Sequence, residues 1–139
     1  MTTQPIKKTD IKRKWHHIDV KGEVLGRVTT KIAQLLIGKN KPYFVSNLDC
    51  GDYVVVTNAA KVKVTGRKAK QKVYSRHSNY PGGFKQVTFS EQKVKDPTKI
   101  IEHAVKGMLP KNKLQSDRMS RLKVFAGEEH LYADKFTKE

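Results

Sequence analysis

A hydroxyl beside an imidazole is an arrangement used in nucleophilic catalysis, and Ser78 directly follows His77 in this chain. The pair lacks the Gly-x-Ser-x-Gly turn that presents a nucleophilic serine, and neighbouring residues rarely face each other productively. Gly38-Lys39 has neither the first glycine of a P-loop nor its Ser or Thr for magnesium. Gly22 and Gly26 do not complete a Gly-x-Gly-x-x-Gly turn. We therefore predict that the protein is not an enzyme and has no small-molecule substrate.

Residues that could bind a metal are sparse. The chain has five histidines and one cysteine, and no histidines show the His-Glu-x-x-His spacing of a zinc helix. His16 and His17 are adjacent, and adjacent side chains on a strand point to opposite faces, so we do not expect them to share a metal. Cys50 has no partner thiol, which excludes an internal disulfide and favours a reducing compartment. We predict no metal and no cofactor.

The positive charge of the chain is its strongest chemical feature. Lysine and arginine total 29 against 13 acids among 139 residues, a formal net charge of +16. A small domain with this excess repels itself unless a polyanion neutralises it in use. No apolar run approaches the roughly 18 residues that cross a bilayer. A membrane surface also fits poorly as that polyanion, because the expected helices carry core-like apolar stripes and no exposed aromatic face opposite a Lys-rich one. The first fifteen residues lack an apolar h-region and contain Asp10, so no secretory signal or transit peptide is expected. We therefore expect a cytoplasmic protein whose partner is a nucleic acid.

Basic residues form several clusters. The densest is the tract from Lys61 to Arg76, which contains no acid and also holds the ring of Tyr74. A merely solvated surface would normally include acids that relieve the repulsion, so this tract favours phosphate contact. Like charges one helical turn apart, as in Arg27 and Lys31, are mildly destabilising unless an outside anion lies between them. The residues predicted to contact a nucleic acid are Lys7, Lys8, Lys12, Arg13, Lys14, Arg27, Lys31, Lys61, Lys63, Arg67, Lys68, Lys70, Lys72, Tyr74, Arg76, His77, Lys106, Lys111, Lys113, Arg118 and Arg121.

An α/β domain must position these residues. The continuous β-branched run at 53–57 suits a strand covered on both faces, so we place it at the centre of a parallel sheet. Apolar residues from Leu25 onward follow the helical period and stop at Gly38, which predicts a helix. No linker divides the chain, so residues 1–139 are expected to be one domain with a basic N-terminal arm at 1–14. Further strands are expected at 15–20, 62–65, 72–75 and 123–126, with a loop at 79–83.

A second long helix is predicted between Asp96 and Leu109. Asp96 can cap this helix, with Pro97 at its first position. A shorter helix is expected at 117–122. Strands separated by helices imply a layered α/β architecture. The apolar stripe of the long helix, which we expect in the core, consists of Ile100, Ile101, Ala104, Val105, Met108 and Leu109.

The distribution of the cations indicates the kind of nucleic acid. Basic residues lie on several elements, and no helix-turn-helix, zinc-finger or RRM signature is present. This pattern favours recognition of a folded RNA through its backbone and shape over sequence reading in a DNA groove.

Several segments, in order and at family spacing, carry a resemblance to a known family. They are Leu25-Gly26-Arg27, Gly38-Lys39, Lys41-Pro42, residues 49–59, Thr65-Gly66-Arg67-Lys68, residues 74–83 and, most specifically, Ala104-Val105-Lys106-Gly107-Met108-Leu109-Pro110-Lys111-Asn112-Lys113-Leu114. Over nearly its whole length the chain resembles the L-thirteen family of large-subunit ribosomal proteins, and the bacterial type is the most similar. Ser46 stands where the family commonly has proline, and the tail at 130–134 departs from the family pattern.

The resemblance implies a fold and a function. The implied fold is a three-layer α/β/α domain with a central, mostly parallel four-stranded sheet. The implied function is direct binding to large-subunit ribosomal RNA, beside neighbouring large-subunit proteins, in support of subunit assembly and without catalysis. The expected RNA contacts also include Lys39, Lys41 and Ser78, which lie in segments that carry the resemblance. The alternative function is that of a free-standing RNA-binding translational regulator.

Overall fold

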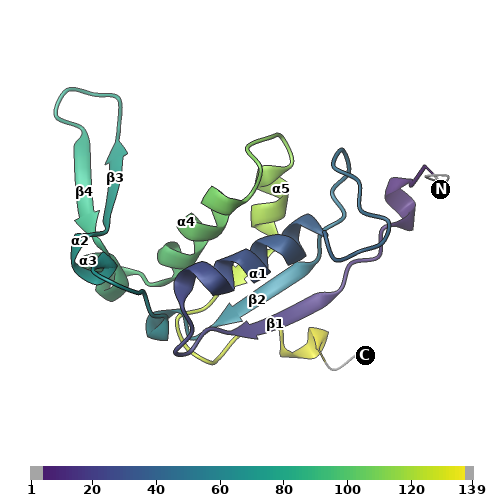
Figure 1. Cartoon of the computed structure of the whole chain (residues 1–139), viewed down its shortest axis with the longest axis horizontal. Helices are drawn as coiled ribbons and strands as arrows, with labels where there is room; N and C mark the ends of the chain where they lie inside the picture. The colour runs from purple at the N-terminus through teal and green to yellow at the C-terminus, as the bar shows by residue number, and fades with distance from the viewer. Residues whose placement is uncertain (1–4, 137–139) are drawn as a thin grey trace.

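Two separate sheets organise the chain in the computed structural model, which describes residues 5–136 (Figure 1). The main sheet is parallel, and its middle strand is the β-branched run whose central place the sequence predicted. The second sheet is an antiparallel hairpin that stands away from the rest of the molecule (Figure 1). The main sheet has the order β1 (Trp15–Asp19), β2 (Tyr53–Thr57) and β5 (Leu122–Val124), and the hairpin consists of β3 (Val73–His77) and β4 (Phe84–Thr88).

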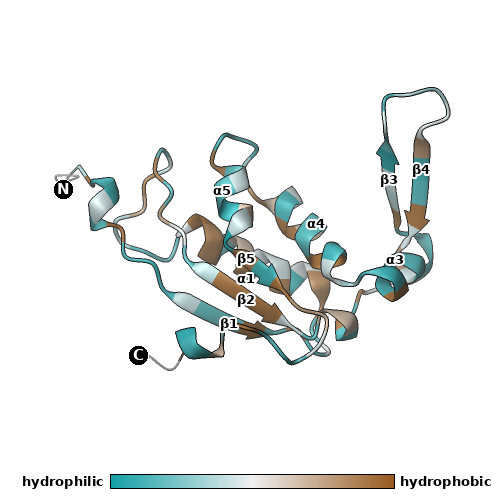
Figure 2. Cartoon of the chain, turned by 180° about the vertical axis from the view of Figure 1, so that it is seen from behind, coloured by the Kyte–Doolittle hydropathy of each residue, from teal (hydrophilic) through white to brown (hydrophobic). Residues whose placement is uncertain are grey.

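The helices lie on one face of the parallel sheet and beside the hairpin. The two longest helices, α1 (Leu25–Ile37) and α4 (Thr98–Met108), pack on each other. Because α1 also contacts β2 and α4 also contacts β5, both helices cover the same face of the sheet. Figure 2 shows strongly apolar residues along β2, which they cover. No helix in residues 5–136 is both long and apolar enough to cross a bilayer. The helices are α1 (Leu25–Ile37), α2 (Lys68–Gln71), α3 (Phe89–Lys95), α4 (Thr98–Met108) and α5 (Gln115–Ser120), with 3₁₀ turns at Lys8–Asp10, Ala59–Lys61 and Ala133–Lys135.

Aromatic side chains cover the opposite face of the parallel sheet. Trp15 of β1 stacks on Tyr53 of β2, with 4.4 Å between ring centroids, and on Tyr132 of the C-terminal segment at 5.2 Å. The His17 ring lies 5.7 Å from that of Phe136. Among the described residues this second covering layer is therefore the C-terminal segment with one 3₁₀ turn, and the expected outer layer of helices is present on one face only.

The predicted four-stranded central sheet is not found in residues 5–136, where the parallel sheet has three strands. Residues 62–65 form only an isolated parallel bridge between Val24 and Lys63, in which the Lys63 amide donates to the Glu23 carbonyl at 2.9 Å. Residues 72–75, which were also expected as a strand, contribute to β3 of the hairpin. Its partner β4 and helix α3 are absent from the sequence-based prediction. An extended pattern shows where a strand lies but not what it pairs with.

Helix α4 follows its predicted register at all but one stripe position. Asp96 caps it, since its carboxylate accepts from the Thr98 hydroxyl at 2.6 Å and from the Thr98 amide at 3.3 Å. Ile101 and Val105 are fully buried in the core. Met108, however, is 44% exposed, because it is the last residue of the helix and projects toward the surface beside Thr30. The prediction of Met108 as a core residue is wrong.

This difference gives a stability test. Replacing Ile101 by Ala removes a fully buried side chain, so we expect the free energy of unfolding to fall by about 3 kcal/mol. Met108→Ala, at an exposed helix end, is expected to cost less than about 1 kcal/mol. Urea denaturation of both variants measures the two losses. Equal losses would mean that the stripe of α4 faces the core in a different register.

Candidate nucleic-acid interface

Most residues predicted to contact RNA are exposed, and three are half-buried: Lys41, Lys72 and Tyr74. Arg118 and Arg121 are buried, with 1% and 6% of their surface exposed. The exposed residues are Lys7, Lys8, Lys12, Arg13, Lys14, Arg27, Lys31, Lys39, Lys61, Lys63, Arg67, Lys68, Lys70, Arg76, His77, Ser78, Lys106, Lys111 and Lys113.

Surface hollows show which of these residues lie together. A cleft of about 700 Å³ between the hairpin, α4 and α5 joins Arg76 from the basic tract to Lys106 from the third basic group. We call it the hairpin cleft. A neighbouring hollow of about 610 Å³ is lined by Lys106 and Lys111. Lys68 and Lys72 line a smaller hollow of about 290 Å³ at the start of α1. Cations that are far apart in the sequence thus share surface depressions.

The N-terminal basic residues lie at the other end of the molecule from the hairpin (Figure 1). Residues 12–14 are held against the loop that precedes β2. The Arg13 guanidinium donates to the Asp49 carbonyl at 2.9 Å, and the Lys12 carbonyl accepts from the Lys41 ammonium at 2.7 Å. The predicted arm at 1–14 is therefore docked over its last three residues. Residues 1–4 lie outside the described part of the chain.

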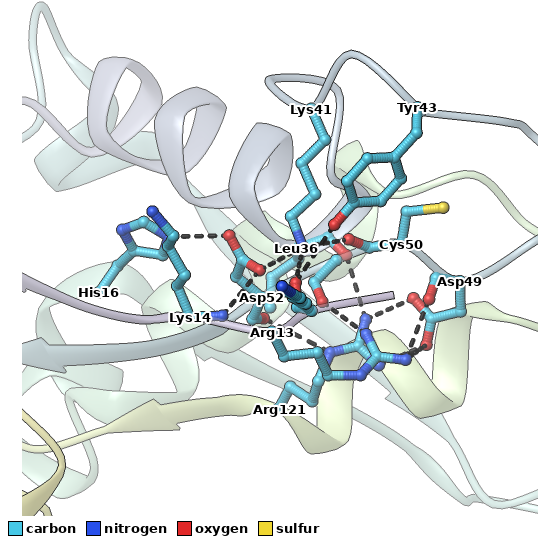
Figure 3. Close-up of polar contacts among 12 residues, drawn as sticks. Arg13, Lys14, His16, Leu36, Lys41, Tyr43, Asp49, Cys50, Asp52 and Arg121 are labelled. Atoms are coloured by element: carbon cyan, nitrogen blue, oxygen red, sulfur yellow. Dashed lines mark hydrogen bonds and ion pairs between the residues drawn. The ribbon is translucent and has the colours of Figure 1, made fainter. Parts of the chain in front are cut away.

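A buried carboxylate explains this docking (Figure 3). The Asp52 side chain is 1% exposed, and its ammonium partner Lys41 lies 2.5 Å away. Asp52 also accepts from the His16 ring at 2.9 Å and from the Lys14 amide at 3.1 Å. Burial raises the pKa of the Asp52 carboxyl, but the hydrogen bonds from Lys41, Lys14 and His16 outweigh it, so the pKa lies below its ordinary value.

A second, partly buried ion pair lies next to the first. The Arg121 guanidinium binds both carboxylate oxygens of Asp49 and also donates to the Leu36 carbonyl at 3.2 Å, at the end of α1 (Figure 3). The Arg118 Nε lies 3.8 Å from the same carboxylate. Burial raises the pKa of Asp49, but the Arg121 hydrogen bonds and charge outweigh it and keep the pKa low. We call the side chains of Asp49, Asp52, Lys41, His16, Arg118 and Arg121 the internal ion network.

The internal ion network removes two residues from the predicted RNA surface. Arg118 and Arg121 were selected for their charge, but their side chains face inward and neutralise Asp49. They serve the fold, and the prediction that they contact RNA is corrected on that ground. Lys41 is similarly engaged, since its ammonium contacts Asp52 and donates to the Cys50 carbonyl at 2.7 Å.

The sequence contains a signal for this network. Asp49 and Asp52 are two acids spaced three apart, directly before a buried strand, in a chain that is poor in acids. Gly51 between them allows the backbones to touch, because a Cβ there would lie 1.7 Å from the Leu36 carbonyl oxygen. Cys50 is fully buried in the same loop. Acids at such a position indicate internal pairing with cations.

The lowered pKa values of Asp49 and Asp52 predict a loss of stability in acid. The unfolded chain takes up protons first as the pH falls, so the free energy of unfolding is highest above the ordinary Asp pKa of about 3.9. It decreases as the pH falls through that value toward the lower pKa of the folded state. Asp52→Asn leaves the Lys41 ammonium without its carboxylate and should cost about 3 kcal/mol at pH 7. The free energy of unfolding of this variant should also depend less on pH than that of the parent.

Urea denaturation between pH 7 and pH 3 measures both effects. Asp117→Asn is the matched control, because this carboxyl is exposed on α5 and should change the free energy of unfolding by only a few tenths of a kcal/mol. A loss at pH 7 that is equal in the two variants would contradict the role given to the buried pair.

The exposed cations, together with ion pairs that stabilise the fold, describe a basic α/β binding protein. Comparison with known proteins gives its family. The sequence pattern of the family described as "Ribosomal protein L13" matches residues 13–131, and the chain belongs to this family. Family membership confirms the predictions of a ribosomal protein that is not an enzyme and that is located with the ribosome in the cytoplasm.

Similar proteins are found in several bacteria. A protein of Dehalococcoides mccartyi named "Large ribosomal subunit protein uL13" is 53% identical over 96% of this chain and 93% of its own length. Proteins of the same name from Lactobacillus johnsonii and Roseiflexus sp. are 50% and 47% identical, each over 96% of this chain and 91% of the relative. The family resemblance inferred from the sequence is thereby confirmed.

Proposed function

We propose that this chain is a structural constituent of the large ribosomal subunit that binds large-subunit ribosomal RNA directly and supports subunit assembly. Its other partners are neighbouring large-subunit proteins. The relatives named above support the placement in the large subunit, since their printed names contain it. The RNA is the partner that the charge and the surface of this chain favour.

The observation that carries the proposal is the separation of the two kinds of cation. Arg118 and Arg121 are buried and lie against the partly buried acid Asp49. The cations of the tract from Lys61 to Arg76 are exposed or half-buried, and the tract contains no acid. Repulsion within such a surface is relieved when phosphates lie against it. We therefore assign the tract and the residues around Lys106 to phosphate contacts.

Co-sedimentation distinguishes this function from a translational regulator that acts away from the ribosome. A structural constituent should sediment with large subunits and remain bound in high salt. A regulator should be found mainly outside them. Recovery of the protein only in ribosome-free fractions would contradict the proposal.

Salt dependence tests the electrostatic basis of binding. Because each neutralised phosphate releases counterions, affinity for large-subunit RNA should fall linearly on a log-log plot against salt. We expect a slope that corresponds to at least about five released counterions. Filter binding at several salt concentrations gives this slope, and a value near zero would exclude phosphate neutralisation as the basis of affinity.

The location of the charge can be tested apart from its amount. In one variant, Arg67→Gln is combined with Lys70→Gln in the basic tract. In the other, Lys21→Gln is combined with Lys135→Gln, which removes the same charge from exposed positions outside the proposed surface. The first variant should bind large-subunit RNA more weakly, with a slope smaller by somewhat under one unit per lost contact.

Both variants should melt at nearly the parent temperature, because all four side chains belong to exposed residues. If the two variants lose affinity equally at every salt concentration, only the net charge matters, and the tract is not an RNA contact. A selective loss in the tract variant supports the assignment.

A further inference from the structure

The hairpin cleft has two walls that come from distant parts of the chain. One wall is the hairpin face that presents Tyr74, Arg76 and Val87, and the other is the exposed side of α4 with Lys99, His103 and Lys106. The three α4 residues are spaced by four and three positions, so they lie on one side of the helix about one turn apart. The exposed ring of His103 therefore lies between two lysines.

The orientation of the His103 ring is set by a contact across the cleft. The Tyr74 ring meets it edge-on, with 5.2 Å between centroids and 81° between planes. The Tyr74 hydroxyl is buried and has no hydrogen-bond partner among the described residues. Burial raises the pKa of this hydroxyl, so it keeps its proton at neutral pH. Buried polar groups are nearly always hydrogen-bonded. A hydrogen-bonding partner for the Tyr74 hydroxyl is therefore missing from this wall of the cleft.

The charges around the hairpin cleft are strongly one-sided. Its lining contains the cations Arg76, Lys95, Lys99 and Lys106, and Glu102 is the one acid among the described lining residues. On the hairpin, Arg76 is also directly opposite Lys85 in the cross-strand register. Like charges in that position destabilise a strand pair. An anion in the cleft would relieve this repulsion.

We propose that the hairpin cleft binds an unpaired segment of RNA, with a base stacked on the His103 ring and the flanking phosphates held by Arg76, Lys99 and Lys106. This inference rests on the proposed function and specifies the form of RNA at this site. A volume of about 700 Å³ lies within the range of pockets that hold a small organic molecule. A cleft of this size suits an unstacked nucleotide, because the face of its base is free to stack on a side chain. It does not suit a duplex, because the bases of a duplex remain stacked on each other.

Anisotropy of a fluorescein-labelled ten-nucleotide oligouridine, measured with the full chain, tests the stacking. His103→Ala should lower the affinity for this single-stranded RNA at least about fivefold, which is the lower end of the effect expected for loss of one base–ring stack. His103→Phe retains a flat ring and should restore the affinity to within about threefold of the parent. Neither change should alter binding of a ten-base-pair RNA duplex by more than about twofold. Thermal melting identifies any variant that has lost its fold.

A charge-matched pair tests the phosphate contacts. Arg76→Gln with Lys106→Gln should reduce the salt slope for oligouridine by about 1.4, since each phosphate contact on a single strand contributes about 0.7. Lys21→Gln with Lys135→Gln, which lie outside the cleft, should reduce it by less than half as much. Equal reductions in the two double variants overturn the placement of phosphates in the cleft.

The remaining outcomes separate the cleft from the proposed function. If His103→Ala binds oligouridine as tightly as the parent does, the cleft inference is wrong, even where large-subunit RNA still binds with a steep salt slope. If the parent binds no large-subunit RNA, the proposed function itself fails. A ten-residue polyglutamate peptide that competes with oligouridine at equal concentration, and that also depends on His103, would assign the cleft to an acidic protein segment instead.

Discussion

Two carboxylates, the buried Asp52 and the partly buried Asp49, are the constraint on which the rest of this structure depends. A buried charge must be paired, and removal of one partner is far more costly than the loss of a surface ion pair. These two acids are paired from several directions at once, by the segment before β1, by the loop after α1 and by the end of α5. Because Arg121 also binds the last-turn carbonyl of Leu36, the same contacts fix the C-terminal end of α1 against the strand that follows. The ion pairs of Asp49 and Asp52 thus fix the position of the loop at 38–52.

The same pairing shapes the outer surface. Because the acids of this loop face inward, they do not neutralise the lysines and arginines of the tract from Lys61 to Arg76. That tract runs from the 3₁₀ turn at Ala59–Lys61 through α2 into the hairpin, and it meets α4 at the hairpin cleft. The docked residues 12–14 lie toward the opposite end (Figure 1). An RNA that contacted both regions would have to follow the long dimension of the molecule, which suits a protein that binds several RNA segments at once.

What could be predicted from the sequence depended on whether the signal was local. β2 was predicted because a continuous β-branched run indicates a strand that is buried on both faces. α1 and most of α4 were predicted because their apolar spacing indicates a helix with one buried side. The pairing of β3 with β4, and the reduction of residues 62–65 to a single bridge, depend on partners elsewhere in the chain, and no local pattern encodes them. Charge had the same limit at the candidate site. Lys68 and Arg121 are both cations in the sequence, but only the fold brings Arg121 to an acid 72 positions away.

The isolated hairpin has a consequence for the protein on its own. Within the described residues, β3 and β4 pair only with each other, so each also has an open edge, and the exposed rings of Tyr80 and Phe84 lie on or next to them. Open strand edges beside exposed apolar side chains are templates for pairing with other chains, and a two-stranded ribbon alone is only marginally stable. Proteases and self-association would therefore act first on the hairpin of copies in which no partner covers it. Under the proposed function, RNA that lies against the hairpin would shield it from both.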